Sequence, residues 1–134
     1  MKTVRIPYKK VKNFILIKEV SYNIRGKYKK VTYIHEEYKN GELFKTYIHR
    51  TNKPAVIIYR SNHISEVQYW KFGILHRTYG PAIIVYYERE IGRSEWYHNG
   101  KKLTKEEVES EEKVMFRRLK ILKMILKIRD KQAI

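Results

Sequence analysis

The sequence contains no cysteine, only three prolines and only six glycines in 134 residues. Without cysteine the chain forms no disulfide, thiolate zinc site, iron–sulfur cluster or cysteine nucleophile. Long apolar runs are also missing, since even runs such as residues 82–87 (AIIVYY) and 14–17 (FILI) are short. A membrane-spanning helix needs about 20 apolar residues, and a signal peptide needs an apolar core of about 7–15. We therefore expect a protein that is neither transmembrane nor secreted.

Basic residues and tyrosines are abundant. The chain has 30 Lys+Arg against 14 Asp+Glu, a formal net charge of +16, and 12 tyrosines. Its hydrophobic share of 43% and aromatic share of 13% favour a folded domain over disorder. The length predicts a single domain over residues 1–134. A charge so unbalanced implies a polyanionic partner, which is nucleic acid, an acidic membrane surface or an acidic protein.

The excess charge lies at the two ends of the chain. Residues 1–35 hold ten Lys+Arg and one Glu, a net +9, and residues 113–134 hold eight Lys+Arg and one Asp, a net +7. Residues 36–112 hold twelve of each sign and are neutral. Solubility alone needs a charge of only about 2–8 on a small domain. This segregation of charge therefore favours basic ends that bind an anion. The alternative is a lysine-rich surface that is only solvated.

The neutral middle repeats itself at a shift of 27 residues. His49-Arg50-Thr51 and Pro54-Ala55 recur as His76-Arg77-Thr78 and Pro81-Ala82, and Tyr69-Trp70 recurs as Trp96-Tyr97. Asn-Gly pairs favour two-residue hairpin turns, and the β-branched and aromatic segments between the turns favour strands. We expect an α+β fold that is mainly β. It would be an antiparallel β-hairpin meander of about seven to nine strands, followed by one long C-terminal amphipathic helix. A basic N-terminal hairpin would span 1–35, the repeat sheet 36–103 and the helix 104–134. Near the N-terminus, residues 14–22 and 27–38 are expected to form a hairpin that turns at Arg25-Gly26.

Residues 69–82 (YWKFGILHRTYGPA) and 96–103 (WYHNGKKL) resemble a known repeat family. The segment is similar to the divergent MORN-type "WYxNGKxHRxxGPA" repeats of proteins from giant DNA viruses, of the Marseillevirus and Mimivirus kind. The resemblance implies elongated β-hairpin arrays without catalytic residues, and a small basic virion protein. MORN repeats elsewhere are associated with lipid headgroups or protein scaffolding. The basic ends of this chain lie outside the repeat.

A long helix is predicted after Lys102. Thr104 and Glu107 have the spacing of a capping box, and no Gly or Pro follows them. About 28 helical residues would span roughly 42 Å. On a helical wheel, the apolar residues form two adjacent stripes, and a lysine-rich face lies opposite them. The first stripe contains Val108, Met115, Leu119, Leu122 and Leu126, and the second contains Ile121, Ile125 and Ile128. Three interpretations compete: packing on the sheet with solvated lysines, the same packing with lysines on phosphates, and insertion into an acidic membrane.

No group of residues in the sequence predicts catalysis, a metal site or a cofactor. His49 and His76 recur at the repeat period, which favours a structural hydrogen-bonding role. His35, Glu36 and Glu37 are adjacent, and successive side chains of a strand face opposite ways, so they do not converge on a metal. No phosphate-binding glycine loop or nucleophile elbow is present. We expect a protein that is not an enzyme.

The sequence favours a sequence-nonspecific DNA-binding protein of a large DNA virus. Duplex DNA is the expected partner, and a surplus apolar helix end favours a homodimer; membrane binding and protein scaffolding are the alternatives. The expected location is the virion and the host cytoplasm, viral factory or host nucleus. The expected phosphate contacts are Lys9, Lys10, Lys12, Arg25, Lys27, Lys29, Lys30, Lys113, Arg117, Lys120, Lys123, Lys127 and Lys131.

Overall fold

The computed structural model describes residues 1–132, which form twelve strands and one helix. Contacts divide the chain into two compact units, Met1–Lys102 and a second that begins at Leu103. The described residues are 52% strand, with antiparallel sheets and hairpins. The prediction of a mainly β fold with a single C-terminal helix is confirmed. The described residues form more strands than the predicted seven to nine, because four of them are only two residues long.

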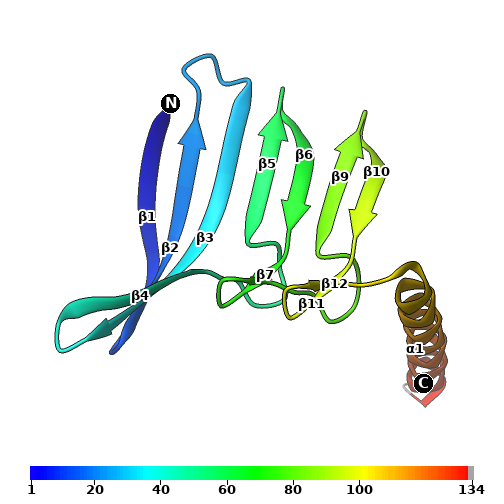
Figure 1. Cartoon of the computed structure of the whole chain (residues 1–134). Coiled ribbons are helices and arrows are strands. Elements are labelled where there is room, and N and C mark those ends of the chain that lie inside the picture. Colours follow the sequence, from blue (N-terminus) through cyan, green and yellow to red (C-terminus); the bar gives the residue numbers. More distant parts are fainter. Residues whose placement is uncertain (133–134) are drawn as a thin grey trace. The chain divides into compact units, whose positions relative to one another are not determined.

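The first unit contains one large antiparallel sheet (Figure 1). Its hydrogen-bonded neighbours are, in order, β1 (Lys2–Val11), β2 (Phe14–Tyr22), β3 (Tyr28–Lys39), β5 (Val56–Arg60), β6 (His63–Gln68), β9 (Ile83–Tyr87) and β10 (Glu90–Glu95). An eighth strand, β4 (Glu42–Ile48), pairs with β3 outside this path. The chain is a meander that leaves this row twice, at β4 between β3 and β5 and at residues 69–82 between β6 and β9.

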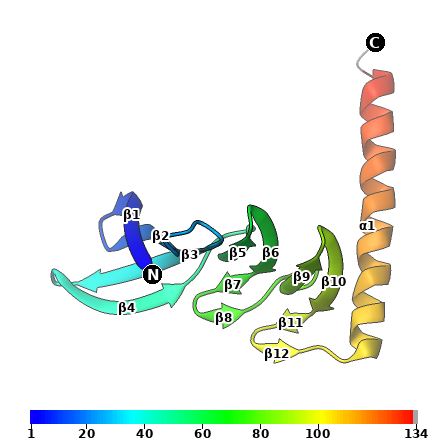
Figure 2. The same cartoon turned by 90° about the horizontal axis from the view of Figure 1, so that it is seen from above.

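A second row of short hairpins lies beside the large sheet (Figure 2). It contains β7 (Trp70–Lys71) with β8 (Ile74–Leu75), and β11 (Tyr97–His98) with β12 (Lys101–Lys102). Strand β3 pairs with two strands along its length, because residues 28–32 pair with β5 and residues 34–39 pair with β4. The loops that follow β4 and β8 carry the His-Arg-Thr sequences.

A row of aliphatic side chains crosses five strands of the large sheet and forms part of its core. The register places Val20, Val31, Ile57, Val67 and Ile84 directly opposite one another in turn, and therefore on one face. Val31, Val67 and Ile84 are buried. This row fixes the register, because a slip of one residue would turn every member to the other face.

Tight turns form where the sequence predicts them. Asn40-Gly41 and Asn99-Gly100 close hairpins with positive φ at both residues, at 54° and 78° and at 50° and 83°. The hairpin of 14–22 and 27–38 is also confirmed, with Gly26 in its turn at φ 70°. Phe72-Gly73 adopts the same geometry, with φ 47° and 77°, although phenylalanine is a poor residue for it.

The 27-residue repeat is present in the hydrogen bonds as well as in the sequence. Arg50 N donates to Trp70 O at 3.3 Å, as Arg77 N donates to Tyr97 O at 3.3 Å. Gly73 N donates to Ile48 O at 2.8 Å, and the equivalent bond from Gly100 N to Leu75 O is also 2.8 Å. Strands β5 to β8 recur as β9 to β12 at the same shift.

The second unit contains the helix α1 (Lys105–Gln132). Glu107 N donates to Thr104 Oγ1 and Thr104 N donates to Glu107 Oε1, both at 3.2 Å. These reciprocal bonds are the predicted capping box, and they satisfy two backbone donors that a helix start would otherwise leave unpaired.

Candidate nucleic-acid interface

The basic residues of the N-terminal segment lie at both ends of the large sheet. Lys9, Lys10 and Lys12 lie around the turn from β1 to β2. Arg25 and Lys27 lie in the turn from β2 to β3, at the opposite end of β2. At about 3.3 Å per residue, β2 separates the two groups by roughly 26 Å. The +9 segment is therefore divided into two patches.

The two remaining N-terminal sites, Lys29 and Lys30, are neighbours on β3 and so face opposite sides of the sheet. The ammonium group of Lys29 lies 4.5 Å from the ring centre of Tyr59 on β5. This contact places the charge of Lys29 itself against the aromatic face. Because they face opposite sides of β3, Lys29 and Lys30 do not belong to one basic stripe along that strand.

The hairpin ends of neighbouring strands bring further cations to the β2–β3 turn. Ser61 N donates to Lys27 O at 2.8 Å, so the β5–β6 turn lies beside the β2–β3 turn. Arg60 stacks on Tyr28 at 5.2 Å, and Arg89 from the β9–β10 turn lies 3.1 Å from His63 Nε2. Sequence reasoning missed Arg60 and Arg89, because they lie in the neutral middle and only sheet order places them here.

The predicted basic residues of α1 lie on one face of the helix, which we call the lysine face. Six basic residues are exposed and lie at spacings of three and four, which places them on one side of an α-helix: Lys113, Arg117, Lys120, Lys123, Lys127 and Lys131. Over residues 1–132, none of these six forms an ion pair with a carboxylate. From residue 113 to 131 the face extends about 27 Å at 1.5 Å per residue.

The repeated histidines join each loop to the next hairpin. His49 Nδ1 accepts a hydrogen bond from Phe72 N at 3.0 Å, and His76 Nδ1 accepts one from Asn99 N at 2.9 Å. The predicted structural role of these histidines is confirmed. Burial lowers the pKa of both side chains, assisted by His35 and Lys71 at His49 and by His98 and Lys71 at His76. Both therefore favour the neutral form that can accept at Nδ1.

The arginine that follows each histidine holds the loop against the large sheet. The Arg50 guanidinium lies 3.8 Å from the ring centre of Tyr33 and donates to Pro54 O at 3.2 Å. Arg77 lies 4.0 Å from the ring centre of Tyr69 and donates to Pro81 O at 3.2 Å. The planar guanidinium stacks and donates together, which a lysine cannot do.

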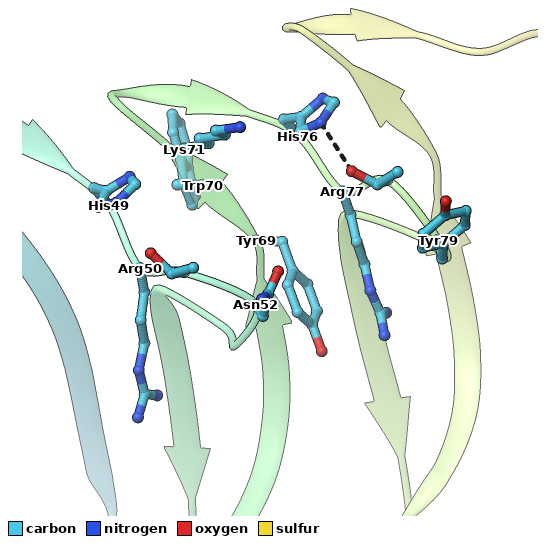
Figure 3. Close-up of a pocket in the computed structure, with 11 residues that line it drawn as sticks. His49, Arg50, Asn52, Tyr69, Trp70, Lys71, His76, Arg77 and Tyr79 are labelled. Carbon is cyan, nitrogen blue, oxygen red and sulfur yellow. Dashed lines mark hydrogen bonds between the residues drawn. The ribbon is translucent and has the colours of Figure 1, made fainter.

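A cavity of about 280 Å³ lies between the two His-Arg loops (Figure 3). Arg50, Lys71 and Arg77 contribute three positive charges to its lining, and no carboxylate lines it. Tyr69 and Trp70 stand between the loops, and the Trp70 indole donates to Gln68 Oε1 at 2.8 Å. The lining favours an anion over a cation, although both arginines already stack on tyrosines and donate hydrogen bonds within the loops.

The adjacent residues His35 and Glu36 make separate contacts. Glu36 is buried and accepts from the Arg5 guanidinium at 3.1 Å, whereas His35 stacks on Phe14 with ring centres 4.7 Å apart. Arg5 also lies 3.5 Å from Glu19, so this cation on β1 stabilises the sheet by contacting carboxylates of β2 and β3. Within residues 1–132, no three His, Asp or Glu side chains come together in a group that could hold a metal ion.

Over the same residues, the structure contains no helix with the length and apolar character that crossing a bilayer requires. The sequence matches no known family, no curated protein and no solved structure.

Proposed function

We propose that this chain is a non-enzymatic protein that binds DNA without sequence preference, and that the lysine face of α1 makes the principal contact. The observation that carries the proposal is the group of six exposed cations on one helix face, none in an ion pair within residues 1–132. Unpaired cations in a row of about 27 Å suit a phosphate backbone, because each can neutralise a phosphate and release its counterion.

The distribution of charge over the first unit supports the same partner class. The cavity between the His-Arg loops is lined by three cations without a carboxylate. The β2–β3 turn presents Arg25 and Lys27 beside Arg60. None of these groups belongs to a recognisable base-reading element, and phosphate contacts by themselves carry no sequence information. Lack of sequence preference is therefore part of the proposal.

A large DNA virus is the source that the MORN-type resemblance implies, and location in the virion and viral factory belongs to that proposal. The repeat geometry at a 27-residue shift suits a hairpin array, but kinship with MORN-type repeats remains a prediction.

An acidic membrane is the second candidate partner. The observation in its favour is that α1 also exposes large apolar side chains, among them Phe116 at 61% and Met124 at 62%. A helix that binds a membrane surface needs such an apolar face together with basic residues. The same helix therefore supports two candidate partners. A competition experiment between duplex DNA and anionic vesicles distinguishes them.

The competition uses the full chain, random-sequence duplex DNA, single-stranded DNA, RNA and vesicles with anionic or neutral headgroups. DNA binding predicts saturable gel shifts with duplex and release of the chain from anionic vesicles when duplex is added. Sedimentation with anionic vesicles that duplex DNA does not reverse would contradict the proposal and favour the membrane. A stronger shift with RNA than with duplex would move the proposal to RNA.

A further inference from the structure

Helix α1 carries a leucine-rich stripe with an opposite charge at each end. Met115, Leu119, Leu122 and Leu126 follow one another at spacings of four, three and four, so they lie along one side of the helix. The same spacing continues to Glu112 before them and to Arg129 after them. Leu119, Leu122 and Leu126 are 54%, 55% and 55% exposed. A single helix cannot cover its own stripe, and an apolar row of this kind is suited to a partner helix.

The stripe is symmetric about its midpoint between residues 120 and 121. Leu119 and Leu122 lie equally far from this point, as do Met115 and Leu126, and as do Glu112 and Arg129. Two copies of α1 that run antiparallel would place Leu119 against Leu122 of the second copy. The same arrangement sets Glu112 against Arg129 at both ends of the contact. In a parallel pair, each residue would face its own copy, so Glu112 would meet Glu112 and Arg129 would meet Arg129.

The net charge along the helix favours the same direction. Residues 105–112 contain five Glu and one Lys, a net −4, whereas residues 113–132 contain eight Lys+Arg and one Asp, a net +7. An antiparallel pair brings the acidic start of each helix beside the basic end of the other. A parallel pair would align the two basic segments and raise their repulsion.

We propose that α1 is a dimerisation helix that pairs antiparallel with α1 of a second copy of this chain, through the stripe from Glu112 to Arg129. The contact is isologous, because a two-fold axis at the midpoint relates its two halves. Lys120 and Lys127 lie away from the stripe and stay outside the contact. The dimer then carries two lysine faces. The pairing itself does not depend on nucleic-acid binding, so it is tested in nucleic-acid-free protein.

Cysteine crosslinking tests the direction of the pair, because the chain has no cysteine and an introduced thiol is the only one. Met115→Cys and Leu126→Cys place thiols eleven residues apart, about 16 Å along the helix. Each full-length variant is treated alone, and then as an equimolar mixture, with a bismaleimide too short to span that separation. The proposal predicts a covalent dimer in the mixture that joins one chain of each variant. A self-linked dimer of either variant alone would indicate a parallel pair and overturn it.

Charge reversal tests the ends of the stripe in chains without cysteine. Glu112→Arg places Arg opposite Arg129 of the second copy, and the dimer dissociation constant from sedimentation equilibrium should rise about tenfold or more. An equimolar mixture of Glu112→Arg and Arg129→Glu chains should recover the dimer, because opposite charges then face each other at both ends. Glu106→Arg, an equal charge change on the other side of the helix, is the matched control and should leave the constant unchanged. A monomeric unchanged chain, or equal constants for Glu112→Arg and Glu106→Arg, would overturn the proposal.

Discussion

At the scale of single residues, a histidine and an arginine together hold each loop of the repeat in place. The histidine accepts from the backbone of the next hairpin, and the arginine stacks on a tyrosine and donates to a proline carbonyl. Both contacts recur at a shift of 27 residues with distances that differ by no more than 0.2 Å, for example 3.8 Å at Arg50 and 4.0 Å at Arg77. Each repeat is therefore joined to its neighbours by side chains as well as by strand pairing.

Low pH should weaken these loop contacts through protonation of His49 and His76. The folded chain holds the pKa of both side chains below the ordinary value, so the unfolded chain takes up protons at higher pH than the folded chain. The contribution of these two histidines to the free energy of unfolding is then fully present above about pH 6.5, and it decreases as the pH drops below that value. The double variant His49→Asn/His76→Asn keeps an acceptor at each site without the titration. Its melting temperature should fall less between pH 7.5 and pH 5 than that of the unchanged chain, and equal losses would contradict this role.

Arg77→Lys should destabilise the first unit by about 1 kcal/mol, because lysine cannot both stack on Tyr69 and reach Pro81 O in the fixed geometry of guanidinium. For a unit of this size the melting temperature should fall by about 4–8 °C. Arg93→Lys, at an exposed position on β10, is the control and should change it little. Thermal unfolding followed by near-ultraviolet circular dichroism measures both, and equal melting temperatures would exclude the stacking role.

At the scale of elements, local sequence signals set the ends of strands and of the helix. Asn-Gly pairs, the turn at Arg25-Gly26 and the Thr104–Glu107 box each form as the sequence predicts, because each depends on interactions within a few residues. The strands β1 and β4 were less predictable. Their place depends on which neighbour they pair with across the sheet, and no short motif encodes that choice.

The capping box offers a test of the helix alone. Thr104→Ala removes the acceptor for Glu107 N and should cost about 1 kcal/mol of helix stability. Far-ultraviolet circular dichroism of the full chain should show less helix at 37 °C. Ser110→Ala removes a hydroxyl from within α1 and should leave the helix signal equal or slightly higher, since alanine favours helix. If both variants lose the same signal, capping does not limit the helix.

At the scale of the whole molecule, charge and repeat divide the chain into parts with different roles. The division into a neutral repeat body and basic ends follows from the sequence, and the structure adds where the basic residues lie. The helix cations share one face because helical periodicity is local. The N-terminal cations do not share one patch, because the hairpin of β1 and β2 carries Lys9 and Arg25 to opposite ends of the sheet. Strand pairing, which the sequence leaves open, decides that outcome.

The lysine face of α1 is the most direct point at which to test DNA binding. The affinity of the full chain for random duplex is measured between 50 and 200 mM salt, together with Lys120→Gln/Lys123→Gln/Lys127→Gln and a control of equal charge, Lys45→Gln/Lys53→Gln/Lys101→Gln. With about six phosphate contacts, the slope of log K against log salt should be roughly −5 for the unchanged chain. The helix variant should lose roughly 2.7 from the magnitude of that slope, and the control should keep it. A slope near zero for the unchanged chain, or equal slopes for the two variants, would contradict binding through the lysine face.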